Sequence, residues 1–192
     1  MNILKKLLLV MAIWGTTGVY GKMDSKAQME ESMALLPFLS ATIEQDRALN
    51  DKDIERYKHF LANKKAQRIE MKDAFLVGSK KAAKVLKPGV TFNTFVAKSI
   101  VLSGKKKMID DYAKENAYED GTDQIVTSTR ITRAVVSIEM EKKYAAMPKE
   151  QREMAKQMMA SMLGVASAED LKVVKPYALE IFEKMKSAGE LQ

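Results

Sequence analysis

Apolar residues recur every three or four positions along most of this chain, which is the spacing of one face of an α-helix and not the alternation of a half-buried strand. A first stripe of this kind consists of Met29, Met33, Leu36, Leu39 and Ile43. A second stripe, which predicts a long helix reaching from Ile54 to about Leu86, consists of Ile54, Tyr57, Leu61, Ile69, Phe75 and Leu76. The pattern therefore favours helices over most of the chain.

Proline, glycine and capping residues mark where these helices begin and end. Pro37 and Pro176 lie inside helical patterns and predict a kink or a break. Asn50 and Ser167 each precede an acidic first turn, as N-cap residues do. Thr91 opens a short helix that is interrupted at Gly104. Further breaks are expected at Lys87-Pro88-Gly89, Gly121, Pro148, Gly164 and Gly189.

The stretch from Ile125 to Met140 fits two secondary structures. Its alternating Thr and Ile residues suit a strand. However, Ile131, Val135 and Ile138 follow helical spacing, and the stretch continues into Glu139-Met140-Glu141-Lys142-Lys143, which favours a helix. We favour the helix. The fold class expected is therefore all-α, a single compact helical domain of about five to seven helices over residues 22–192.

Residues 1–21 have the layout of a secretory signal peptide. Lys5 and Lys6 precede the apolar run LLLVMAIW, and the polar stretch 15–21 follows with Val19 and Gly21 where a signal peptidase needs small residues. The uncharged stretch of 15 residues is shorter than the roughly 20 apolar residues of a membrane-spanning helix. We expect cleavage after Gly21, a periplasmic or secreted protein, and no transmembrane segment in the mature chain.

Composition removes most kinds of catalytic and metal site. The chain has no Cys and one His, His59, which excludes a thiolate zinc site and a Cys nucleophile and leaves no second imidazole to share a metal ion. No catalytic residue, metal ligand or cofactor is predicted. The 14 Met residues are unusual, because thioethers fill irregular gaps and also suit adaptable apolar surfaces. An apolar binding face is predicted at Met154, Met158 and Met162.

Charge is distributed unevenly. Residues 58–114 contain 14 Lys or Arg and only 4 Asp or Glu, while the segments on either side are slightly acidic. The cations are mostly Lys, a hydrated point charge that suits diffuse anionic surfaces more than the reading of bases, so no specific nucleic acid is expected. An electrostatic patch is predicted at Lys80, Lys81, Lys84, Lys87, Lys105, Lys106 and Lys107. Its expected partner is an anionic cell-envelope surface or an acidic protein.

These observations favour an exported, non-enzymatic helical protein that binds a partner or acts as a chaperone, with a Lys-rich central face for anionic envelope partners. Two alternatives remain open. One is a secreted hydrolase that uses carboxylates borne on helices, because such pairs leave no spacing signature in a sequence. The other is an accessory component of a secretion or pilus assembly. The oligomeric state is not predicted.

Overall fold

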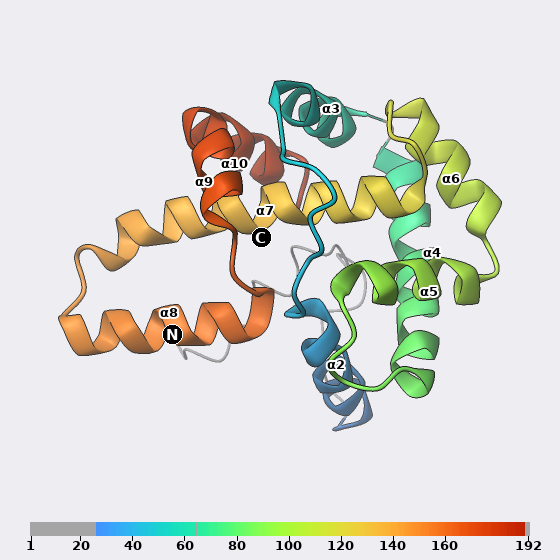
Figure 1. Ribbon diagram of the computed structural model, residues 1–192, viewed down its shortest axis with the longest axis horizontal. Helices are drawn as coiled ribbons and strands as arrows, with labels where there is room; N and C mark the ends of the chain where they lie inside the picture. Colours follow the sequence, from blue (N-terminus) through green and yellow to red (C-terminus); the bar gives the residue numbers. More distant parts are fainter. Residues whose placement is uncertain (1–25, 64, 191–192) are drawn as a thin grey trace.

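A computed structural model describes residues 26–63 and 65–190 of the chain (Figure 1). These residues form helices and no strand, which confirms the all-α class; the helices are more numerous than the expected five to seven. In chain order they are α2 (Lys26–Leu39), α3 (Asp51–Ala62), α4 (Lys65–Val85), α5 (Phe92–Ser103), α6 (Lys106–Glu115), α7 (Gly121–Tyr144), α8 (Lys149–Leu163), α9 (Ala168–Val174), the short 3-10 helix η3 (Lys175–Tyr177) and α10 (Ala178–Ser187).

Short polar side chains start several of these helices. The Asn50 side chain accepts hydrogen bonds from the backbone N–H groups of Lys52 and Asp53, while the Asp53 carboxylate accepts one from the Asn50 N–H. Thr91 caps α5, and Ser167 caps α9 by accepting from the Asp170 N–H at 3.0 Å. Each of these side chains satisfies backbone donors that the first turn of a helix leaves unpaired. The predicted starts at Asn50, Thr91 and Ser167 are confirmed.

Helix α7 is the central element of the structure. It runs through the middle of the molecule, and α3, α5, α6, α9 and α10 all pack against it (Figure 1). Residues 129–136 are buried on every side, although four of the eight are Thr or Arg. The polar members find partners: the Thr129 hydroxyl donates to the Ile125 carbonyl oxygen at 2.6 Å, and Thr132 Oγ1 lies 2.8 Å from the Tyr57 hydroxyl. The stretch from Ile125 to Met140 is therefore helical, as predicted.

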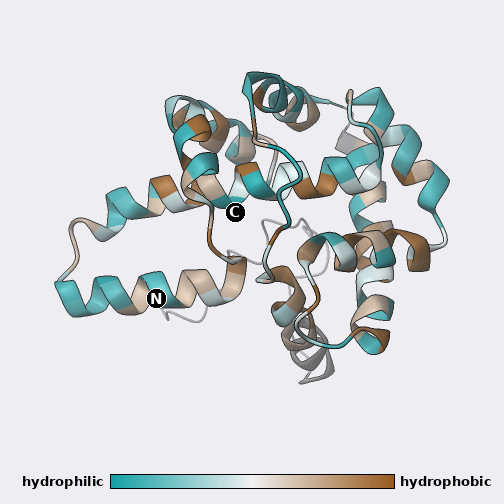
Figure 2. Cartoon of the chain, in the orientation of Figure 1, coloured by the Kyte–Doolittle hydropathy of each residue, from teal (hydrophilic) through white to brown (hydrophobic). Residues whose placement is uncertain are grey.

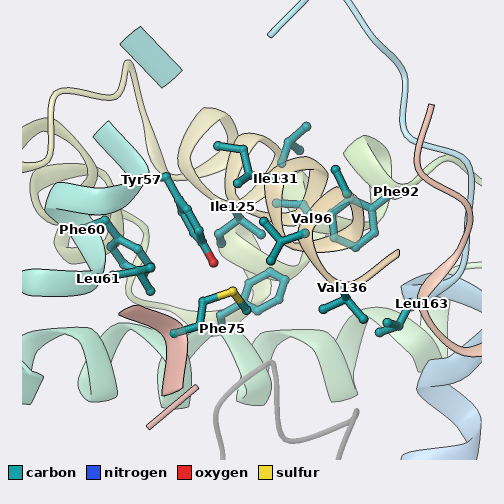
Figure 3. Close-up of a cluster of buried hydrophobic side chains, with 14 of the residues drawn as sticks. Tyr57, Phe60, Leu61, Phe75, Phe92, Val96, Ile125, Ile131, Val136 and Leu163 are labelled. Carbon is teal, nitrogen blue, oxygen red and sulfur yellow. The ribbon is translucent and has the colours of Figure 1, made fainter. Parts of the chain in front are cut away.

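Side chains from many helices form one buried apolar cluster (Figure 3). Phe92, Phe95 and Val96 of α5 meet Ile131 and Val135 of α7 there, all of them inaccessible to solvent. Phe38 stacks on Phe95 with ring centroids 4.8 Å apart, which joins α2 to the same cluster. Aromatic rings stacked with an offset at this distance add to the gain from burial alone.

Several predictions about the N-terminal half of the structure are wrong. The helix expected from Ile54 to Leu86 is two helices, because the chain leaves helical geometry at Asn63 and restarts at Lys65. Ile69, from the second predicted stripe, is exposed, and so is Val85. Met33, from the first predicted stripe, is exposed as well. Val85 is the last residue of α4, and the chain turns away there before a neighbouring helix covers it.

Among the described residues, no helix is both long enough and apolar enough to cross a membrane. The expected signal peptide at residues 1–21 lies outside the described residues, so the expectation of export stays a prediction.

Candidate functional site

Helix α5 packs directly on the second half of α4, and this contact sets the position of the predicted lysines. At the crossing, a Cβ atom on Gly78 would lie 1.9 Å from the Ser99 carbonyl oxygen, so no side chain fits between the two backbones. The Ser99 hydroxyl donates to the Phe95 carbonyl oxygen at 2.7 Å and so stays within its own helix. A glycine on α4 thus allows the close approach that holds the lysine-bearing half of α4 in place.

Two of the predicted lysines, Lys81 and Lys84, share the outer surface of this half of α4. Lys81 and Lys84 lie four and seven positions after Val77, which is the spacing of one helix face. The side chains of Val77, Lys81 and Lys84 are all exposed. The Lys81 ammonium donates to the Leu102 carbonyl oxygen at 3.2 Å, next to the end of α5. Lys87 follows in the exposed turn after α4. We call Val77, Lys81, Lys84, Val85 and Lys87 the α4 outer stripe; Lys80 is half-buried and is not part of it.

The other three predicted lysines lie elsewhere and are paired. Lys105 contacts Glu70 at 3.1 Å, near the beginning of α4. Lys106 binds Asp110, and Lys107 binds Asp111 at 2.6 Å, each one turn along α6. The hydrogen bonds to these carboxylates raise the pKa of both Lys106 and Lys107. The structure therefore does not gather all seven lysines in one patch. Lys81, Lys84 and Lys87 are exposed on α4 and in the turn after it, whereas the lysines at the start of α6 are paired with acids of α4 and α6.

A cavity of about 530 Å³ lies beside this second group, between α4 and α6. Its lining consists of Gln67, Glu70, Gly104, Lys105, Lys107, Met108, Asp111, Tyr112 and Glu115. Both lysines of the lining are the ones paired with Glu70 and Asp111, so the cavity presents no unmatched ammonium group to an anion.

Only part of the predicted methionine face is exposed to solvent. Helix α8 lies beside the second half of α7, on the side of the molecule away from α4, α5 and α6 (Figure 1). Met154 is 70% exposed, Met158 is half-buried, and Met162 is buried in the core. The exposed apolar surface of α8 is therefore concentrated around Met154, and Met162 serves packing.

Buried ionic groups that sequence reasoning missed hold the ends of the helices. The Arg130 guanidinium forms a two-pronged contact with the Asp170 carboxylate, at 2.6 and 3.1 Å, and both side chains are buried. Arg133 donates to the carbonyl oxygens of Leu39 and Ala41 at 2.6 and 3.2 Å, with no carboxylate beside it among the described residues. Burial lowers the pKa of Arg133 to about 10. One feature of the sequence could have indicated these buried charges: Arg130 and Arg133 lie in a helix that is otherwise rich in Thr, Ile and Val.

A second buried group surrounds Asp53, at the start of α3. Its carboxylate accepts hydrogen bonds from Arg56 and, at 2.6 and 2.8 Å, from Arg47. Burial alone would raise the pKa of Asp53, but the hydrogen bonds from the two arginines outweigh burial and lower it. A carboxyl held ionised in this way does not act as a general acid, which requires a raised pKa. Asp53 is therefore suited to holding the start of α3 rather than to donating a proton in the hydrolase alternative.

The described residues contain no group of three or more His, Cys, Asp or Glu side chains placed to hold a metal ion. His59 is exposed on α3. Comparison of the chain with protein-family models, with curated proteins and with solved structures finds no match.

Proposed function

We propose that this chain is an exported, non-enzymatic helical binding protein that docks on an anionic partner of the cell envelope through the α4 outer stripe. Export rests on the signal-like sequence of residues 1–21. Docking rests on the concentration of exposed lysines in a segment that contains no Asp or Glu.

That concentration is the observation that carries the proposal. Residues 74–109 contain eight lysines and not one Asp or Glu. Some lysines on other helices, namely Lys58, Lys142 and Lys186, each bind an acid three residues away. Lys84 and Lys87 are exposed, and the described residues give them no acidic partner. Their charge is therefore available to an outside anion without first breaking an ion pair.

The expected binding free energy of the stripe for an anionic surface follows from its number of lysines. Each Lys near an anionic bilayer contributes about 1 kcal/mol, and this attraction is screened over about 8 Å at physiological salt. Three lysines together contribute about 3 kcal/mol, or roughly a hundredfold in a binding constant. Such binding is sufficient to recruit the protein to a surface with many charges and remains reversible by salt.

The test measures binding to a soluble polyanion, labelled poly-glutamate, by fluorescence anisotropy from about 20 to about 300 mM salt. The variant K81E/K84E/K87E should bind at least about tenfold more weakly than wild type at low salt. The control K149E/K172E/K175E changes the net charge equally, at three exposed lysines outside the stripe, and should lose less than half as much binding free energy. Equal loss in both variants would mean that only net charge matters and would refute a specific docking surface.

A second candidate function, chaperone-like binding of apolar segments, is favoured by one observation. Met154 exposes a flexible thioether on a helix at the periphery of the molecule. If α8 binds unfolded chains, Met154→Gln should reduce the suppression of aggregation of a heat-denatured test protein, while K81E/K84E/K87E should leave it unchanged. Identical suppression by wild type and Met154→Gln would remove this candidate.

A further inference from the structure

We infer that the anionic partner of the α4 outer stripe is the surface of a lipid bilayer, with Val77 and Val85 entering the bilayer interface between the lysines. This inference rests on the proposed function and names the class of partner that the same surface binds.

Apolar side chains are interleaved with the lysines of the stripe. Val77 is 48% exposed and Val85 is 62% exposed. They are eight positions apart, so they lie on the same side of α4 as Lys81, which is midway between them. Figure 2 shows this mixture of hydrophilic and hydrophobic residues along the second half of α4.

The turn that follows α4 has the same character. Residues 86–90 read Leu-Lys-Pro-Gly-Val, with Pro88 exposed and with Leu86 and Val90 only partly buried against the core. Gly89 has a φ of 100°, a backbone conformation that suits glycine, and a Cβ placed there would meet nothing within 4 Å. The turn is thus an open, acid-free end of the helix in which apolar groups sit beside Lys87.

This combination distinguishes a bilayer from a soluble polyanion. A polyanion offers charge alone and gives exposed valines no environment better than water. An anionic bilayer offers phosphate groups for the ammonium groups and, directly beneath them, acyl chains for the valines. Long lysine side chains suit this arrangement, because their methylene stems lie along apolar surface while the charged ends reach the headgroups. Residues 74–109 contain no Asp or Glu, so Asp73, one turn before Val77, is the last acid on α4, and none lies along the stripe itself to be repelled by such a surface.

The experiment uses the full chain with vesicles of phosphatidylcholine, with or without about 30% phosphatidylglycerol, and with poly-glutamate in parallel. The variant V77S/V85S removes the apolar groups without changing charge, and Ser has nearly the same helix propensity as Val. It should bind anionic vesicles at least about fivefold more weakly than wild type and bind poly-glutamate equally well. The control V165S/L179S alters two other exposed apolar side chains and should behave like wild type on both partners.

A fluorescent reporter tests insertion directly. The only Trp in the chain is Trp14, so the fluorescence that Val85→Trp adds is obtained by difference from wild type. With anionic vesicles this added emission should shift to the blue and be quenched by brominated acyl chains, while that of the control Leu179→Trp should not.

The outcomes separate the inference from the proposed function. Two outcomes would overturn the bilayer inference and leave electrostatic docking intact: the protein binds poly-glutamate but not vesicles, or wild type and V77S/V85S bind vesicles equally. An acidic polymer or protein would then be the partner. Failure to bind either partner would overturn both.

Discussion

The backbone of Gly78 in α4 packs against the backbone of Ser99 in α5, with no room for even one methyl group between them. A Cβ at position 78 would meet three backbone atoms at 1.9 to 2.9 Å: the carbonyl oxygen and carbon of Ser99 and the amide nitrogen of Ser103. Backbone atoms of a packed helix cannot rotate away as the end of a side chain can. The position of the α4 outer stripe relative to the core thus depends on a glycine.

We predict that Gly78→Ala destabilises the protein, although the same change usually stabilises an exposed helix by about 1 kcal/mol. Forcing the two helices apart costs about 3 kcal/mol, at the upper end of what overpacking a core costs. Urea unfolding followed by circular dichroism measures the loss. Gly89→Ala is the control, because open space surrounds position 89. This variant should lose only about 1 kcal/mol of unfolding free energy, from the strain of a positive φ. A Gly78→Ala variant as stable as wild type would show that the two helices are not this close.

We predict that Glu190→Gln costs about 3 kcal/mol, far more than an exposed carboxylate would. The buried Glu190 carboxylate contacts both Arg68, at 3.1 Å, and Lys72. Arg68 in turn donates to the Leu61 and Ala188 carbonyl oxygens, at the ends of α3 and α10. Neutralising Glu190 leaves the buried Arg68 and the half-buried Lys72 without a counter-charge.

The same unfolding measurement on Glu183→Gln provides the control for this prediction. Glu183 binds Lys186 at 2.7 Å on an exposed surface, and such a pair contributes less than about 1 kcal/mol. Equal losses in the two variants would show that the Arg68–Lys72–Glu190 group does not stabilise the helix ends.

We predict that the two arginines beside Asp53 make stability depend on pH below neutrality. The folded pKa of Asp53 lies below its unfolded value of about 4, so the unfolded state takes up the proton first as the pH falls. The stabilisation is therefore complete above about pH 5 and is lost as the pH drops through the folded pKa.

The measurement is the melting temperature of wild type and Asp53→Asn between about pH 2 and about pH 7. Asparagine keeps an oxygen that can accept the Asn50 N–H, so the variant removes charge more than capping. The difference between the two proteins should be several degrees at pH 7, where it reflects about 2 kcal/mol, and should shrink toward acid pH. A difference that does not change with pH would contradict the role assigned to the Asp53 charge.

The sequence predicted the helices well where local chemistry decides them. Asn50, Thr91 and Ser167 cap the starts of helices by accepting hydrogen bonds from backbone N–H groups two or three positions away. Such short-range caps can be predicted from the sequence. The break at Asn63 was missed because no Gly or Pro marks it. Arg68 reaches back to the carbonyl oxygens of Phe60 and Leu61, so a contact between two helices accompanies this break.

The candidate site was predicted in composition but not in arrangement. The excess of lysine between residues 58 and 114 is visible in the sequence, and so is the helical spacing of Lys81 and Lys84. Lys106 and Lys107 pair with Asp110 and Asp111 of their own helix. The pairing of Lys105 with Glu70, by contrast, depends on the packing of α6 against α4, which no local pattern contains. The exposure of Val85 depends on where α4 ends, since it is the last residue of the helix.

The most direct test of the docking surface is the perturbation of backbone amide signals in nuclear magnetic resonance spectra as poly-glutamate is added at low salt. If the α4 outer stripe is the docking surface, the largest shifts should fall on residues 77–90 and should vanish at about 300 mM salt, where screening is strong. Shifts concentrated on α6 around Lys106, or on α8 around Met154, would contradict the account.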